Sequence, residues 1–108
     1  MADPMKIRAT VKDGVADVRV LVAHEMETGQ RKDAAGKTIA AWHITELNAS
    51  LNGKPVLKAY WGPAISKNPL LQFKVRGAKP GDKIVVSWVD NRDDKRSDEA
   101  TVVETRAG

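Results

Sequence analysis

The sequence has no cysteine, few aromatic residues and no long hydrophobic run. The lack of cysteine excludes a thiol nucleophile, a Cys-ligated zinc or iron–sulfur site and a disulfide framework. Near the N-terminus the longest uncharged apolar run is Val20–Ala23, far too short for a membrane-spanning helix. The first fourteen residues contain no apolar core of a signal peptide. We therefore expect neither a transmembrane segment nor a classical signal peptide.

Composition predicts one soluble globular domain over residues 1–108, with 42% apolar and 30% charged residues. The formal charge of +4 raises the question of whether the chain binds nucleic acid. The cations are spread along the chain, and the densest clusters, Arg31-Lys32 and Lys95-Arg96, both adjoin aspartates. A basic nucleic-acid-binding β-domain is therefore kept as the alternative function. Attraction to an acidic protein or an anionic substrate is the rival electrostatic interpretation.

Hydrophobic and polar residues alternate over most of the chain, which is the period of a half-buried β-strand. The pairs Asp13-Gly14 and Asn52-Gly53 favour two-residue hairpin turns. No segment of ten residues keeps the helical period. Strands are predicted over residues 6–11, 16–22, 42–51, 55–61, 71–76, 83–90 and 99–105. About seven short strands in this length predict an all-β, immunoglobulin-like antiparallel β-sandwich, with a small barrel as the alternative.

Residues 24–36 interrupt the alternation and carry many charges, so they predict a long loop. The predicted hairpin over residues 42–61 is unusual because both of its faces are mostly apolar. If the turn sets a regular register, one face holds Trp42, Ile44, Leu57, Ala59 and Trp61, and the other holds Leu47, Ala49, Leu51, Val56 and Tyr60. Either a bulge near Glu46 switches the alternation, or the outer face meets another protein.

The sequence predicts no catalytic residue, metal site or cofactor. His24 and His43 are the only histidines, and His24 lacks the second histidine of an HExxH zinc motif. The acidic segment 90–99 is interrupted by cations and lacks the spacing of a calcium loop, so it predicts a solvated hairpin tip. Gly77–Lys83 misses the spacing of a phosphate-binding loop. No serine, histidine and aspartate are spaced as a catalytic set.

Three stretches resemble SoxZ, the smaller subunit of the bacterial sulfur-oxidation carrier complex. They are HEMETGQRKDAAGK (24–37), LNGKPVLKAYWGPAISKNPLLQFKVRGAKPGDKI (51–84) and SWVDN (87–91). The similarity runs from Met5 to about Val103, and its most specific motifs are HxMETGxRKD and WGPAxSKNP.

The resemblance implies an immunoglobulin-like, non-catalytic subunit that forms a heterodimer with SoxY. The cysteine in the C-terminal arm of SoxY carries the sulfur substrate between enzymes that contain haem c, manganese or molybdenum. It also implies a periplasmic location, reached by export together with a partner that bears the signal.

Two surfaces are predicted for these contacts. The 42–61 hairpin and residues 62–69 are expected to dock on SoxY, with Trp42, Tyr60, Trp61, Ile65 and Asn68 at the interface. The 24–33 loop is expected to steer acidic or anionic visitors to the carrier, through His24, Arg31 and Lys32.

Overall fold

The computed structural model describes residues 3–104, and this part of the chain contains eight strands and no helix. No helix long and apolar enough to cross a membrane occurs among these residues. The strands are β1 (Lys6–Lys12), β2 (Val15–Leu21), β3 (Ile44–Leu51), β4 (Lys54–Tyr60), β5 (Leu70–Arg76), β6 (Lys83–Asp90), β7 (Lys95–Thr101) and β8 (Val103–Glu104).

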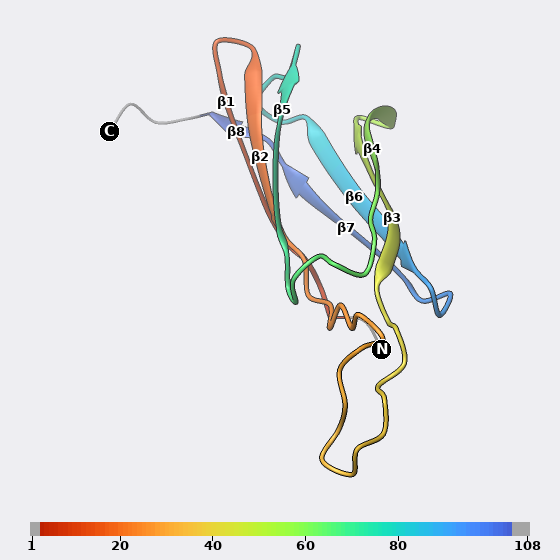
Figure 1. The fold of residues 1–108 in the computed structure, drawn as a ribbon. Helices are drawn as coiled ribbons and strands as arrows, with labels where there is room; N and C mark the ends of the chain where they lie inside the picture. The colour runs from red at the N-terminus through yellow and green to blue at the C-terminus, as the bar shows by residue number, and fades with distance from the viewer. Residues whose placement is uncertain (1–2, 105–108) are drawn as a thin grey trace.

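The strands form two four-stranded sheets that pack face to face (Figure 1), in the orders β5-β2-β1-β8 and β4-β3-β6-β7. The chain crosses between the sheets after β2, β4, β5 and β7. Each sheet keeps two edge strands, so the described strands form an open sandwich and not a closed barrel. Neighbouring strands are antiparallel except β1 and β8, which run parallel. The predicted immunoglobulin-like sandwich is therefore confirmed, with eight strands instead of seven.

Both predicted hairpin turns form with the backbone that their sequences favour. Asp13 and Gly14 have φ of 54° and 76°, and Asn52 and Gly53 have φ of 50° and 84°. Positive φ at both central positions matches the right-handed twist of the flanking strands. These turns fix the β1–β2 and β3–β4 registers at their closed ends, where Lys12 pairs with Val15 and Leu51 with Lys54.

The core lies between the sheets and is built from alternate residues of each strand, as the period of two requires. Its fully buried side chains are mostly branched aliphatic residues, which suit a pleated, half-buried surface. The largest of them are Ile44, Leu47, Ile84, Val18, Val20, Val22, Val86 and Val102.

Two irregularities correct the predicted pairing of the β3–β4 hairpin. Thr45 is an extra residue opposite β6, because Ile44 pairs with Asp90 and Glu46 with Val89. A second register shift between Ala49 and Ser50 pairs Ala49 with Leu57 instead of Val56. These bulges switch the alternation, so most members of both apolar sets turn inward, whereas Tyr60 stays exposed. The buried residues are Ile44, Leu47 and Ala49, and the half-buried residues packed against the core are Leu51, Val56, Leu57 and Trp61. The hairpin does not have two apolar faces.

The C-terminal end differs from the prediction of one strand over residues 99–105. Strand β7 begins at Lys95, and the chain then changes sheets, so that β8 pairs with β1. Buried Val102 lies at the crossing, where its N–H donates to the Asp82 carbonyl (2.7 Å) and its carbonyl accepts from Gly81 (2.8 Å). Residue 105 of the predicted strand lies outside the described residues.

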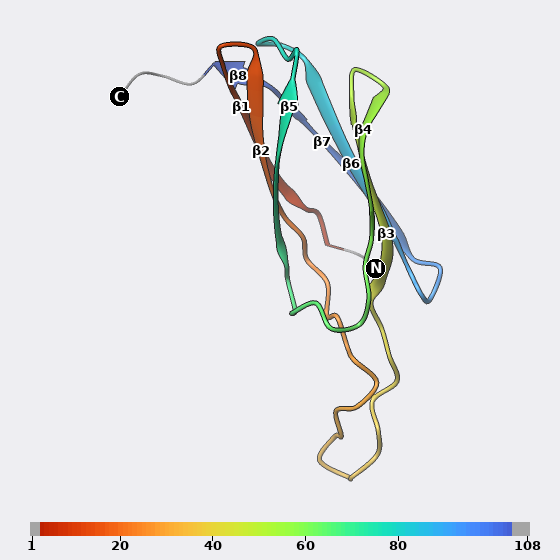
Figure 2. The ribbon, with the colours of Figure 1, turned by 45° about the horizontal axis from the view of Figure 1, so that its top comes forward.

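Residues 22–43 form a long connection that projects from one end of the sandwich (Figure 2). Its two arms are joined by isolated bridges, between Glu27 and Trp42 and between Lys32 and Thr38. The predicted loop is confirmed, and its backbone is held as an irregular ribbon. We call this segment the projecting loop.

Candidate functional site

A buried polar cluster lies where the projecting loop leaves the sandwich, and its centre is Asp90. The Asp90 Oδ2 atom accepts from His24 Nε2 (3.0 Å) and from Trp42 Nε1 (2.8 Å). Its Oδ1 atom accepts from the backbone N–H groups of Arg92 and Asp94, at 2.9 Å each. The carboxylate is thus surrounded by four donors while its residue is only 2% exposed. We call Asp90, His24, Trp42 and Met26 the anchor cluster.

His24 links this carboxylate to the loop backbone. Its Nδ1 atom accepts the N–H of Met26 (3.1 Å), so the ring proton lies on Nε2 and is donated to Asp90. The imidazole ring also packs edge-on against Trp42 and Trp88, with centroids 5.1 Å apart in both pairs. His24 is therefore a fully bonded interior group that fixes the start of the loop.

The hydrogen bonds on Asp90 also control its ionisation. Burial alone would raise the pKa of this carboxyl, but the bonds from His24, Trp42, Asp94 and Arg92 outweigh it and lower the pKa below its ordinary value. The anchor cluster therefore favours the charged form of this carboxylate. Among the described residues, no group of three His, Cys, Asp or Glu side chains is arranged to hold a metal ion.

The role of Asp90 differs from the predicted solvated hairpin tip. The turn 91–94 is exposed for the most part, but the Asp90 side chain points into the sandwich and organises the turn through its backbone bonds. A signal was present in the sequence. The alternation of Ile84, Val86 and Trp88 extends by one step to Asp90 and predicts an inward side chain.

The structure separates the three residues predicted for electrostatic docking. His24 is buried at the base of the projecting loop, whereas Arg31 and Lys32 are exposed near its tip. The Arg31 guanidinium forms a two-pronged bond with Glu27, at 2.6 Å for Nη2 and 3.1–3.2 Å for Nε. The hydrogen bond from Arg31 lowers the pKa of Glu27. Arg31 is thus neutralised locally, and the steering role of the loop stays a prediction.

The five residues predicted for the partner interface fall into three groups. Tyr60 is 75% exposed, on the outer side of edge strand β4. Trp42, Trp61 and Ile65 are half-buried, the first in the anchor cluster and the other two against the core. Asn68 has its side chain tied to the loop: its Oδ1 atom accepts from His24 N–H (3.0 Å), and its own N–H donates to the His24 carbonyl (2.9 Å).

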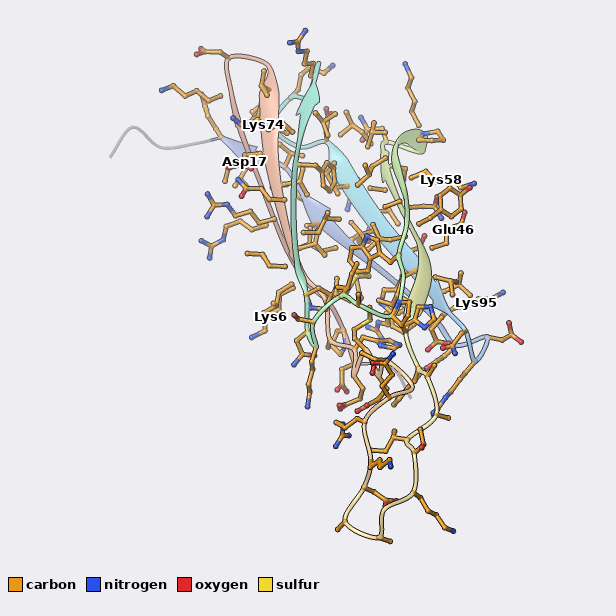
Figure 3. The ribbon with its side chains drawn as sticks, viewed as in Figure 1. Lys6, Asp17, Glu46, Lys58, Lys74 and Lys95 are labelled. Carbon is orange, nitrogen blue, oxygen red and sulfur yellow. The ribbon has the colours of Figure 1, made fainter. Side chains whose placement is uncertain are left out.

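Tyr60 belongs to an outer surface of mixed character, which we call the mixed face: the outer side of the β4-β3-β6-β7 sheet. The registers place Tyr60, Glu46, Val89 and Lys95 in one row across it, and Lys58, Asn48, Ser87 and Ser97 in the next. The Lys58 ammonium pairs with Glu46 at 3.0 Å and lies 5.7 Å from the centre of the Tyr60 ring. Charges of both signs lie on this surface, as Figure 3 shows for Glu46, Lys58 and Lys95. Small polar side chains lie between them in the second row.

Solved structures support the same fold class. Two structures of superoxide reductase (neelaredoxin) from Ignicoccus hospitalis, one of them a variant, align with TM-scores of 0.59 and sequence identities of 17% and 18%. Each alignment covers 96% of this chain and 82% of the other. At this identity the likeness concerns the fold alone. No curated protein sequence matches this chain significantly.

The fold and the anchor cluster define a class: an immunoglobulin-like β-sandwich with one long loop pinned to its end by a buried His–Asp pair. Within this class, residues 5–101 match the family described as "Sulphur oxidation protein SoxZ". Because the match spans nearly all of the sequence, the chain belongs to the SoxZ family, and its role is in sulfur oxidation.

Proposed function

We propose that this chain is the non-catalytic binding subunit of a sulfur-carrier complex. It binds SoxY, whose C-terminal cysteine carries the covalent sulfur intermediate, and the two form a heterodimer in the periplasm. The chain enters that compartment together with its signal-bearing partner. Transient visits by the haem c, manganese and molybdenum enzymes of the pathway are part of this proposal. It is supported by the family match over residues 5–101.

The mixed face supports the position of the SoxY contact. Tyr60 is the one large aromatic residue that is strongly exposed within the described chain, and tyrosine is among the residues that dominate interface energetics. The Lys58 ammonium, which pairs with Glu46, lies 5.7 Å from the centre of its ring. Small side chains in the adjoining row leave room for a partner to approach the sheet. We place Tyr60 at the centre of the interface.

Trp61 and Ile65, two other predicted anchors, are poorer test positions. Both pack partly against the core, so their truncation would remove folding energy together with any contact to SoxY. The backbone N–H of Trp61 also donates to the Thr45 carbonyl at 3.0 Å, next to the bulge in β3. The Tyr60 side chain is exposed and does not pack against the core, so we expect its substitution to separate binding from folding.

The test is calorimetric titration of purified SoxY with the Tyr60→Ala chain. A central aromatic contact predicts a loss of about 2 kcal/mol, or about 30-fold in affinity, with an unchanged melting temperature. Tyr60→Phe keeps the ring and should retain most of the affinity. Leu70→Ala removes an equally exposed apolar side chain from the opposite sheet and should have no effect on SoxY binding.

Two results would contradict the proposal at different levels. Equal affinities for Tyr60→Ala and the unaltered chain remove the mixed face from the interface. Failure of the unaltered chain to bind SoxY at all refutes the proposed function itself.

A further inference from the structure

The outer side of the other sheet, β5-β2-β1-β8, collects positive charge from three strands. Register pairing puts Arg8 beside Arg19, and Asp17 beside Lys74. We call this surface the basic face, and its six cations are Lys6, Arg8, Lys12, Arg19, Lys74 and Arg76. All six side chains are exposed. The chain as a whole has an excess of four cations, so this one surface accounts for its basic character.

Internal partners do not explain these charges. Asp17 is the one carboxylate on the three long strands of this face, and it is engaged by Arg19 (3.6 Å) and by the Gln72 amide (3.0 Å). The other five cations form no ion pair within residues 3–104. Arg8 and Arg19 lie directly opposite each other, an arrangement that is unfavourable for the isolated sheet. Figure 3 shows Lys6, Asp17 and Lys74 on the side of the sandwich away from Glu46, Lys58 and Lys95.

Exposed apolar side chains lie among the cations. Leu21, Leu70 and Val103 are 43%, 67% and 53% exposed, and all three belong to this sheet. Leu21 and Leu70 are register partners. Together with Lys6, Arg8 and Arg19 they line a shallow depression at the end of the sheet nearest the projecting loop. The basic face therefore offers an apolar contact point surrounded by positive charge.

We infer that the basic face docks an acidic protein surface, and that this partner is distinct from the one on the mixed face. Charge complementarity requires carboxylates, and the Leu21–Leu70 depression fits an apolar side chain in their midst. Single-stranded nucleic acid fits less well, because none of the five aromatic rings lies exposed on this face to stack on bases.

A labelled acidic peptide with regularly spaced leucines is the probe, titrated into the ¹⁵N-labelled full chain at about 50 mM salt. Amide signals of β1, β2 and β5 are expected to shift, whereas those of β3 and β6 stay in place. The triple variant Lys6→Gln/Arg8→Gln/Lys74→Gln should weaken binding by about tenfold. A matched triple, Lys54→Gln/Lys83→Gln/Lys95→Gln, loses the same charge from the other sheet and should change affinity by less than about twofold.

Further arms separate the possible occupants. Leu21→Ser/Leu70→Ser should weaken peptide binding without altering net charge. Tighter binding to a poly-dT oligonucleotide or to phosphatidylglycerol vesicles than to the peptide would overturn a protein partner. Equal losses in the two triple variants would show only general attraction and would refute the docking surface. Loss of SoxY affinity in the first triple variant would mean that the basic face belongs to the SoxY contact, which also refutes a distinct partner.

Discussion

The anchor cluster and the basic face use charge in opposite ways. Asp90 is one buried carboxylate with four hydrogen-bond donors around it. The basic face holds six exposed cations and a single carboxylate, Asp17, which pairs with Arg19. Burial explains the first arrangement, because a charge removed from water must be fully hydrogen-bonded. Water solvates the second, so its cations remain available to a partner.

The contrast predicts which charges contribute to the stability of the fold and which do not. Removing a donor or acceptor from the anchor cluster leaves other buried groups without a hydrogen-bond partner. Removing a cation from the basic face leaves no buried group without a partner, and it relieves repulsion. Stability measurements should therefore separate the two regions by sign as well as by size.

The largest effect is expected from Asp90→Asn. An amide has one acceptor oxygen, so two of the four donors around Asp90 lose their partner, and the negative charge disappears. We expect a loss of about 3 kcal/mol in the free energy of unfolding, measured by urea denaturation. Asp93→Asn is the matched control, because that exposed residue lies in the same turn and asparagine tolerates its φ of 61°. A wild-type midpoint for Asp90→Asn would contradict the role of the cluster.

Acid should distinguish the same two regions. The pKa of Asp90 is lowered by folding, so the stability that it confers is present above its ordinary value of 3.8 and is lost as the pH falls through the folded pKa. Each such carboxyl contributes a slope of at most about 1.4 kcal/mol per pH unit. Unfolding measured between pH 5 and pH 2 should show a flatter decline for Asp90→Asn than for Asp93→Asn.

A smaller effect is expected at Arg92, an exposed cation that does have an internal partner. Its guanidinium lies 4.4 Å from the centre of the Trp42 ring, at the edge of the anchor cluster. Arg92→Ala should cost about 0.5–1 kcal/mol in thermal unfolding. Arg92→Lys keeps a cation and should recover part of the loss. An unchanged melting temperature in both variants would mean that Arg92, like the cations of the basic face, does not stabilise the fold.

The smallest effect should have the opposite sign. Arg8→Gln removes the like-charge pair with Arg19 and should stabilise the chain by about 0.3 kcal/mol at low salt. Because salt screens the repulsion, the gain should vanish at high ionic strength. Lys95→Gln, on the mixed face, serves as the control. A destabilised Arg8→Gln chain would mean that Arg8 has a structural partner.

Local chemistry made most of the fold predictable. The alternating residues and the Asp13-Gly14 and Asn52-Gly53 turns predicted six of the strands within a few residues, because turn type and period of two are local properties. For the hairpin, the sequence leaves two interpretations, a bulge near Glu46 or an outer face that meets another protein. Whether the bulge forms depends on which side chains can be buried beside β6, and the residues of the hairpin alone do not contain that information.

The surfaces were less predictable because they are assembled from distant residues. Lys6, Arg19 and Lys74 are far apart in the sequence and become neighbours only when β5, β2 and β1 align. Along the sequence, the cations of this face are therefore scattered. The partner-binding hypothesis began from two apolar faces on one hairpin, which the bulges removed. Of the predicted interface residues in this hairpin, Tyr60 is exposed, whereas Trp61 packs against the core.

The edge strands of the two sheets bear on whether copies of the chain can pair with one another. Strands β4 and β5 each end a sheet, so their outward backbone groups resemble a template for a further strand of another molecule. Pro55 interrupts that template on β4, and Lys74 and Arg76 place repelling charge along β5. Copies of the chain are thereby discouraged from stacking edge to edge into fibres.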